Sequence, residues 1–513
     1  MRSSIRALSG VAAAVALAVG TAPSASAEPP GAAGTPAPRV EWAPCEELAE
    51  VECGALSLPI DWERPRGERF DLAVARRKAT DPTKRVGVLV INPGGPGGSG
   101  VSFALGANEY FSPAVLERFD VVGFDPRGVA RSQPVKCSLD LLLDAPSTYP
   151  ADEAGFRELA AYNRELAADC REHSGPIYDH ADTLSVVKDI DALRKALGER
   201  KINYYGISYG TLIGQQYAEE FGRDIRAMVL DSNMDHSLGV RRFNETEAVA
   251  AEDSFHEFVK WCDRTPSCAL HGRDVAAVWD DLLARADRGE LTNPGNPGQV
   301  ITARQLSGAA LGAFYGPDWA PLAQLVADLV AGAPSAAAFA AEETAENPFA
   351  AVFCQDWAIR VKSHRELSAL VERNNRLAPH MRGSSLGHEA TAGCVGLPEK
   401  VNNPQHRLRI EDAPKILMTN ALHDPSTPYE WAVNAHRQSR DTTVLLTYEG
   451  WGHGVYGRSD CTTGAMDEYL ITLKTPRDGA RCAAVEPPAE SVASLDATPR
   501  PVGPAPGVPG WER

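Results

Sequence analysis

The chain has 513 residues, enough for one large domain with an insertion, and its 43% hydrophobic content is ordinary for a soluble globular protein. Its formal net charge of −17 argues against nucleic acid or an anionic membrane as a partner. No P-loop, nucleotide-binding fingerprint or zinc-protease motif is present, so neither a cofactor nor a metal is expected.

The first 27 residues have the pattern of a secretory signal peptide. Arg2 and Arg6 precede the apolar run VAAAVALAV, which is too short to span a bilayer, and the small residues Ala25 and Ala27 fit cleavage after Ala27. We therefore expect a secreted, extracellular protein. Residues 28–39 are rich in Pro, Gly and Ala and predict a loose leader, and residues 485–513 predict a proline-rich disordered tail.

Export affects the interpretation of the ten cysteines, because disulfides persist outside the cell. Ten cysteines allow a very large number of pairings, and one or two free thiols remain an alternative. We predict five bridges between cysteines that follow each other along the chain: Cys45–Cys53, Cys137–Cys170, Cys262–Cys268, Cys354–Cys394 and Cys461–Cys482.

Short apolar runs alternate with helical patterns along most of the chain, which predicts an α/β fold with a mostly parallel sheet covered by helices on both faces. Buried strands are expected within residues 85–95, 119–128, 201–208, 225–232, 413–424 and 442–450. Helices are expected at residues 183–198, 209–222, 428–439 and 466–475.

The pattern changes between residues 234 and 404, where the sequence is Ala-rich, polar and mainly helical. A helical block between two strands of one sheet predicts a lid. The domain order is therefore an α/β core at 40–233, a lid at 234–404 and the second part of the core at 405–484.

Ser208 is the predicted nucleophile. It lies in Gly206-Ile207-Ser208-Tyr209-Gly210, between a predicted strand and a predicted helix. The G-x-S-x-G pattern places a serine on a strained turn, with small residues where neighbouring backbone passes closely. The pentapeptide alone occurs by chance in glycine-rich chains, but the strand before it and the helix after it are the context that the motif requires.

A catalytic serine needs a base, and the base needs an orienting acid. In α/β hydrolases these follow in the order Ser, acid, His, each after a late strand. Asp424 follows the strand at 413–424, and His453 lies in a glycine-rich loop after the next strand. Thr427 is expected to hydrogen-bond the Asp424 carboxylate.

Backbone N–H groups must stabilise the tetrahedral intermediate. One should belong to Tyr209, directly after the serine. The other should come from the loop NPGGPGGSG (92–100), in which the two prolines have no N–H, leaving Gly94 or Gly95; we prefer Gly95.

With these residues in place, the chain from about Cys45 to Cys482 resembles the secreted bacterial tripeptidyl aminopeptidases, α/β-hydrolase serine peptidases related to proline iminopeptidases. The resemblance is carried by motifs that are specific in combination: CGALSLPIDWERPRGERFDLAVARRKA, NPGGPGGSG, FDPRGVARS, YYGISYGTLIG, VFCQDW, HDPSTP and GWGHG. His423 is bulkier than the residue expected before the acid. The resemblance implies removal of tripeptides from the free N-termini of peptides and proteins.

Two other functions stay open: an esterase or another peptidase of the same fold, and a non-catalytic binding protein on a hydrolase scaffold. An exopeptidase needs a carboxylate for the substrate's α-amino group. Because three extended residues span about 10 Å, that carboxylate should belong to the lid. Asp356, in an apolar context, is the first candidate, with Glu245 and Glu257 after it. A monomer is expected.

Overall fold

The computed structural model describes residues 39–293, 296–332, 344–383 and 385–488. The predicted signal peptide, all but the last residue of the predicted leader, and residues 489–513 of the predicted tail lie outside the described residues.

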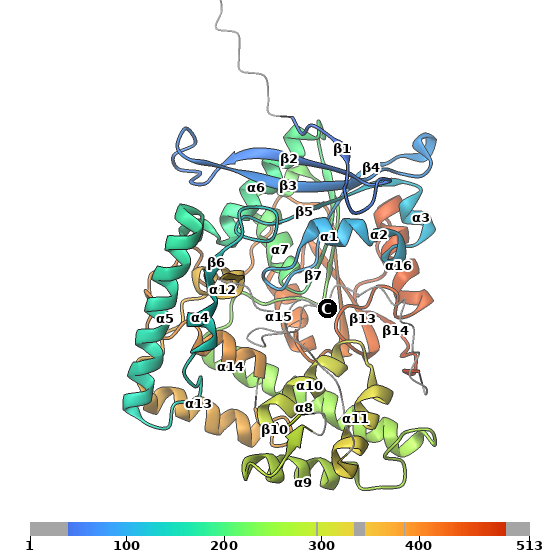
Figure 1. Cartoon of the computed structure of the whole chain (residues 1–513). Coiled ribbons are helices and arrows are strands. Elements are labelled where there is room, and N and C mark those ends of the chain that lie inside the picture. Colours follow the sequence, from blue (N-terminus) through green and yellow to red (C-terminus); the bar gives the residue numbers. More distant parts are fainter. Residues whose placement is uncertain (1–38, 294–295, 333–343, 384, 489–513) are drawn as a thin grey trace, which may run out of the picture. The chain divides into compact units, whose positions relative to one another are not determined.

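A ten-stranded sheet forms the centre of the described chain, with strand order β1-β2-β3-β5-β4-β7-β8-β12-β13-β14 (Figure 1). From β5 to β14 all neighbouring strands are parallel, whereas β1, β2 and β3 add an antiparallel edge. The predicted mostly parallel α/β sheet is therefore confirmed. The strands are β1 (Ala43–Pro44), β2 (Glu52–Pro59), β3 (Arg69–Arg77), β4 (Gly87–Asn92), β5 (Phe119–Phe124), β7 (Ile202–Ile207), β8 (Ile225–Asp231), β12 (Ile416–His423), β13 (Thr443–Trp451) and β14 (Ala480–Cys482).

Helices cover both faces of this sheet because its strands are apolar on both sides. In β4, Val88 and Val90 belong to one hydrophobic cluster, while the alternating Leu89 and Ile91 belong to the other. The first cluster is completed by α6 (Thr183–Ala196), α7 (Tyr209–Phe221) and α15 (Tyr429–Gln438). The second is completed by α1 (Gly100–Leu105), α2 (Ala107–Tyr110), α3 (Pro113–Leu116) and α16 (Asp460–Thr472).

The chain between β8 and β12 forms a mainly helical insertion (Figure 1). Its helices surround a separate apolar cluster that contains Trp261, Trp279 and Trp319. Its elements are α8 (Val240–Arg264), α9 (Val275–Asp287), β9 (Thr292–Asn293), β10 (Asn296–Val300), α10 (Ala303–Tyr315), α11 (Trp319–Ala331), β11 (Thr344–Glu346), α12 (Pro348–Asp356), α13 (His364–Leu377) and α14 (Ser385–Ala392). We call this segment, from β8 to β12, the lid.

A second excursion leaves the sheet between β5 and α6 and was not predicted. It contains β6 (Lys136–Ser138), α4 (Leu139–Leu143) and the long helix α5 (Glu153–Ser174). Strand β6 pairs with β11 of the lid, and Asn163 of α5 donates hydrogen bonds to the carbonyls of Ala392 and Val395. This excursion therefore joins the lid to the first half of the core.

Helix ends follow local chemistry. The predicted helix at 466–475 instead spans Asp460–Thr472, because Ser459 and Thr462 form a capping box and Leu473 ends the helix in the left-handed region. The helix predicted at 183–198 begins at Thr183, capped by Asp182, and ends at Ala196.

All five predicted disulfides are present, and the described residues contain no free cysteine. Two bridges lie within the lid, namely Cys262–Cys268 and Cys354–Cys394. A search of the described helices for an apolar stretch of membrane-spanning length finds none.

Candidate active site

Ser208 occupies a sharp turn between β7 and α7, with φ 60° and ψ −127°. A non-glycine residue in this region is strained, and such strain is typical of functional turns. Steric contacts leave room only for glycine at the two flanking positions. A Cβ on Gly206 would lie 2.4 Å from the carbonyl oxygen of Gly210, and a Cβ on Gly210 would lie 2.7 Å from that of Asn92. The local sequence therefore folds as the G-x-S-x-G pattern predicts.

Asp424 and His453 meet at the carboxyl ends of β12 and β13. His453 Nδ1 lies 3.0 Å from Oδ1 of Asp424, with both side chains buried. Asp424 also accepts hydrogen bonds from Ser232 Oγ at 2.7 Å and from the backbone and hydroxyl of Thr427, as predicted for Thr427. Burial opposes ionisation of Asp424, yet His453, the Ser232 hydroxyl and the backbone N–H of Ser426 hold the pKa of its carboxyl below the ordinary value.

The loop that carries His453 is held by a carboxylate that the sequence did not single out. Asp231, at the end of β8, accepts hydrogen bonds from the backbone N–H groups of Val455 and Tyr456 and from Tyr205 Oη. Burial raises its pKa. Its own carbonyl accepts from the Ser208 N–H at 3.0 Å, so one residue links the serine turn to the histidine loop.

The lid covers the histidine. The backbone N–H of His453 donates to the carbonyl of Tyr315 at 3.0 Å, and the centroids of the two side-chain rings lie 4.8 Å apart. Tyr315 Oη donates to Ser426 Oγ at 2.8 Å. Within the described residues, Nε2 of His453 is buried and has no hydrogen-bond partner. That nitrogen is the atom that a general base would use.

The loop after β4 lies against the serine turn. A Cβ on Gly94 would be 3.0 Å from Ser208 Cβ and 2.8 Å from the Tyr209 nitrogen. The Gly94 N–H already donates to Oδ1 of Asn92 at 2.9 Å, which favours Gly95 as the second donor to a developing oxyanion. Gly95 and Tyr209 both line the same cavity as Ser208.

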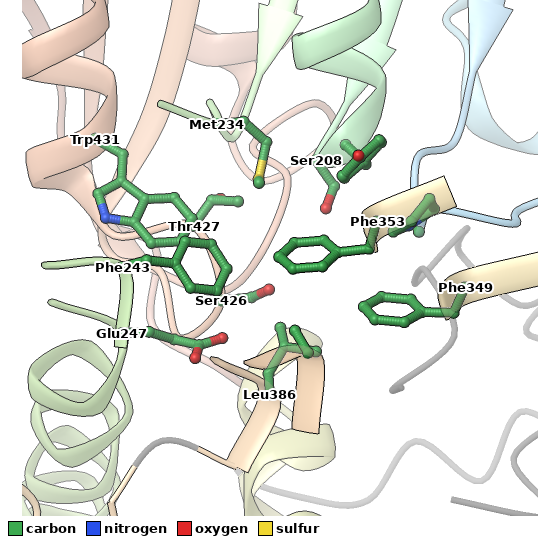
Figure 2. Close-up of a pocket in the computed structure, with 14 residues that line it drawn as sticks. Ser208, Met234, Phe243, Glu247, Phe349, Phe353, Leu386, Ser426, Thr427 and Trp431 are labelled. Atoms are coloured by element: carbon green, nitrogen blue, oxygen red, sulfur yellow. The ribbon is translucent and has the colours of Figure 1, made fainter. Parts of the chain in front are cut away.

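This cavity is lined by residues of the serine turn and of the lid. Figure 2 shows Ser208 on one side, Phe353 and Phe349 beside it, and Glu247 and Trp431 on the opposite side. Most of the lining is apolar and aromatic, as in small-molecule and peptide pockets. It consists of Gly95, Pro96, Ser208, Tyr209, Met234, Phe243, Glu247, Phe349, Phe353, Leu386, Ala390, Ser426, Thr427 and Trp431.

Glu247 is the acidic side chain of this lining, and sequence reasoning missed it. It lies on α8, is 2% exposed, and accepts a short hydrogen bond from the N–H of Gly387 through Oε2. Phe243 lies one turn earlier on α8 and lines the same cavity. The i, i+4 spacing predicts that these two side chains share a face, but not that this face lies opposite Ser208.

Asp356, the first sequence candidate for binding the substrate's amino group, has a different position. It is fully buried, does not line the cavity, and accepts hydrogen bonds from Tyr209 Oη, Asn403 Nδ2 and both the N–H and hydroxyl of Thr183. Burial and nearby Asp182 raise its pKa to about 7. The structure therefore gives no support to the prediction that Asp356 binds the substrate's amino group. Asp356 instead holds Tyr209, the residue after Ser208.

The two other sequence candidates for binding the amino group, Glu245 and Glu257, also form ion pairs or hydrogen bonds outside the cavity. Glu245 forms ion pairs with Arg241 and Arg373. Glu257 accepts hydrogen bonds from Lys260 and from Trp451 Nε1. Neither lines the cavity.

Comparison with known proteins agrees with the fold. The model of the alpha/beta hydrolase fold family matches residues 87–456. The serine protease Hip1 of Mycobacterium tuberculosis (strain ATCC 25618 / H37Rv) is 32% identical over 479 residues, 86% of this chain and 91% of Hip1. The tripeptidyl aminopeptidase of Streptomyces lividans is 31% identical over 468 residues, 84% of each chain.

A third relative has a name from another class of hydrolase. Carboxylesterase B of Mycobacterium tuberculosis (strain ATCC 25618 / H37Rv) is 30% identical over 501 residues, 89% of this chain and 93% of the esterase. With the family match and the two peptidases, the conclusion is that this chain is a serine hydrolase of the α/β-hydrolase family, in the group that includes tripeptidyl aminopeptidases and Hip1.

Proposed function

We propose that this chain is a secreted serine exopeptidase that releases tripeptides from the free N-termini of peptides and proteins. The observation that carries the proposal is the cavity, which has Ser208 in its lining and the buried carboxylate of Glu247 across from it (Figure 2). An enzyme that cleaves near a free N-terminus needs a nucleophile and a partner for the α-amino group within one short pocket.

The proposed chemistry proceeds through an acyl-enzyme on Ser208. The Ser208 hydroxyl attacks the scissile carbonyl while its proton passes to Nε2 of His453, and Asp424 keeps the imidazole oriented through Nδ1. The N–H groups of Gly95 and Tyr209 stabilise the oxyanion. His453 then gives its proton to the leaving amine as the peptide bond breaks. Water next attacks the carbonyl of the acyl-enzyme and gives a proton to Nε2 of His453, which returns it to Ser208 Oγ as the ester bond breaks and the tripeptide leaves with a free carboxylate.

Glu247 is the proposed receptor for the substrate's α-amino group. A desolvated ammonium needs a charged or strongly polar partner, and the carboxylate is the strongest one available in an apolar cavity. The aromatic side chains between Ser208 and Glu247 would contact the side chains of the bound residues. Three extended residues would reach about 10 Å from the scissile carbonyl to the amino group, which sets the length of the product.

The Glu247→Gln variant tests this assignment. We expect kcat/KM for a free-amino tripeptide amide to fall by about 10- to 100-fold, an effect of about 1.4–2.7 kcal/mol, while hydrolysis of p-nitrophenyl acetate is unchanged. Glu245→Gln, on the same helix but outside the cavity, is the matched control. Equal losses on both substrates, or no loss on the peptide, would exclude Glu247 as the amino receptor.

Mass spectrometry of the products tests the length of the released fragment. A decapeptide with a free N-terminus should give successive tripeptides, and its N-acetylated form should resist cleavage. Internal cleavage, or equal cleavage of the two peptides, would contradict the exopeptidase proposal and leave a serine peptidase of another mode.

An esterase is the second candidate, and two observations favour it. A relative of similar identity is named carboxylesterase B, and the cavity lining is largely apolar. If kcat/KM for medium-chain acyl esters exceeds that for free tripeptide amides by tenfold or more, and Glu247→Gln changes neither, the esterase proposal replaces the peptidase one.

Export is part of the proposal. Five disulfides fit an oxidising compartment, where such bonds persist. N-terminal sequencing of the protein from culture supernatant should begin at Glu28 if cleavage follows Ala27. Recovery of the protein only inside cells, with Met1 retained, would contradict it.

A further inference from the structure

Two histidines and a glutamate of the lid converge away from the cavity. Glu252 and His256 lie one turn apart on α8, and His380 lies in the segment between α13 and α14. One ligand atom from each lies within 4.8 Å of the other two. We propose that these three side chains form a binding site for a divalent transition metal, with zinc the best match to a set of two imidazoles and one carboxylate.

The carboxylate of Glu252 is held in position before any metal binds. Its Oε2 accepts hydrogen bonds from the backbone N–H groups of His380 and Met381, at 3.1 and 3.2 Å. Its Oε1 contacts Nδ1 of His380 and lies 3.5 Å from Nε2 of His256. The carboxylate is thus anchored through one oxygen and directs the other toward both imidazoles.

The imidazole of His380 is also fixed in orientation. Its ring stacks on Phe255 at 4.7 Å, and its carbonyl accepts a hydrogen bond from Trp279 Nε1 at 2.8 Å. Its second nitrogen, Nε2, lies 4.0 Å from Oδ2 of Asp280. A carboxylate beside the distal nitrogen of a ligating histidine is the usual partner that orients such a ligand in metal proteins.

The expected coordination needs little movement. In a tetrahedral zinc site, bonds of 2.0–2.2 Å separate the ligand atoms by about 3.4 Å. Bound zinc would replace the direct contact between Nδ1 of His380 and Oε1 of Glu252. The His256 side chain is 50% exposed, so a metal could enter from solvent and keep water as its fourth ligand.

Two other groups of metal-ligand side chains are poorer matches. Asp253, Glu257 and His423 also converge, but Lys260 lies 2.7 Å from Glu257 and would repel a cation. In the third group both cysteines are joined as the Cys137–Cys170 disulfide and have no thiolate to offer.

A metal here would connect two parts of the lid that also shape the cavity. Helix α8 carries Glu247, and α14, which follows His380, carries Leu386 and Ala390 of the cavity lining. Gly387 of α14 already donates to Glu247. The metal would therefore fix α8 and α14 relative to each other, in a structural rather than a catalytic role.

Metal binding to the full mature chain tests the site, independently of any activity. After dialysis against a chelator, titration with Co²⁺ should give one equivalent bound, with the strong visible absorption of a tetrahedral site, and Zn²⁺ should displace it. Excess Zn²⁺ should raise the Tm of the wild type by several degrees, because a ligand that binds the folded state stabilises it.

The His256→Ala variant should bind Co²⁺ at least tenfold more weakly and lose the Zn²⁺-dependent rise in Tm. His173→Ala is the matched control, because His173 and Asp169 form a similar i, i+4 pair without a second histidine. Absence of stoichiometric binding, or equal binding by His256→Ala, would overturn the proposal. Loss of binding in Asp253→Asn but not in His256→Ala would also overturn it, because the metal would then occupy the neighbouring group. A metal-free His256→Ala with the Tm of the metal-free wild type shows that the variant folds.

Discussion

The sheet and the lid contribute different groups to one cavity. Ser208, Asp424 and His453 lie on short loops at the carboxyl ends of β7, β12 and β13, where parallel strands hold them together. The lid contributes Glu247 and much of the aromatic lining. In the proposed mechanism, the sheet carries the groups for bond cleavage and the lid carries those that select a substrate. Changes in the two regions should therefore be separable by experiment.

The largest effect is expected from the sheet. Ser208→Ala should reduce turnover of peptides and esters alike by roughly 10⁴-fold or more, because no other group replaces the nucleophile. The Tm should change little, since the substitution removes one hydroxyl at a surface of the cavity. The Ser208→Ala variant should also lose labelling by a fluorophosphonate probe. Retained turnover, with another serine labelled, would move the catalytic centre elsewhere.

The second-largest effect is expected from Asp424→Asn, which should lower kcat by about 10³- to 10⁴-fold on both peptide and ester substrates. The amide cannot accept all the hydrogen bonds that Asp424 accepts, and it leaves His453 in the wrong tautomer. The contrast with Glu247→Gln, expected to affect peptides alone, is the sharpest test of the division between sheet and lid. An Asp424→Asn variant that loses peptide activity but keeps full ester activity would contradict this division.

The disulfides offer a comparison in stability. Cys354–Cys394 of the lid closes a loop with a sequence separation of 40, whereas Cys45–Cys53 at the sheet edge closes one of 8. In the chain-entropy model, removing the first bridge by paired Cys→Ala changes should cost about 4 kcal/mol and removing the second about 2.5 kcal/mol. Urea unfolding of the two double variants measures the difference. A reversed order would mean that strain or residual structure outweighs loop length.

The smallest expected effect concerns acid sensitivity of the lid. His388 of α14 is buried, with Nε2 2.8 Å from the carbonyl of Thr148, and burial lowers its pKa to about 3. The unfolded chain binds this proton with a pKa near 6.5. Stability that is present above pH 6.5 is therefore lost as the pH falls toward 3.

His388→Gln can keep the hydrogen bond to Thr148 without titrating. We expect its unfolding free energy to fall less steeply between pH 7 and pH 5 than that of the wild type. The same change at the partly exposed His173 is the control. Identical slopes for wild type and His388→Gln would show that another group determines the acid response.

The sequence was most informative where buried strands end in small residues. In runs such as 85–95 and 225–232, successive side chains belong alternately to the two apolar clusters, so both faces of the sheet are covered. The order of strands and loops along the chain can be read from these runs. The positions of Ser208, Asp424 and His453 follow in turn, because parallel strands present their carboxyl ends at one edge. Their catalytic roles stay predictions until the variants are measured.

The lid could not be predicted to the same depth. Asp356 has an apolar sequence context, which indicates burial, but no pattern shows whether a buried carboxylate faces a substrate or the donors of Thr183 and Tyr209. Glu247 looks like one acid among several on α8, and its placement depends on how α8 packs over the sheet. Helical periodicity predicts which face of a helix is buried, but not which element packs against that face.

The lid enters and leaves the sheet at neighbouring strands. Strands β8 and β12 are paired, and just beyond β8 the N–H of Ser232 donates to the carbonyl of Thr419 at 2.9 Å. Because its two ends are adjacent, the whole segment is inserted at a single place in the scaffold, and its loss or exchange would leave the order and register of the strands intact. Selection could therefore substitute one such segment for another in a single genetic event. In an engineered chimaera, a lid taken from a relative should bring its substrate range to a scaffold that keeps Ser208, Asp424 and His453.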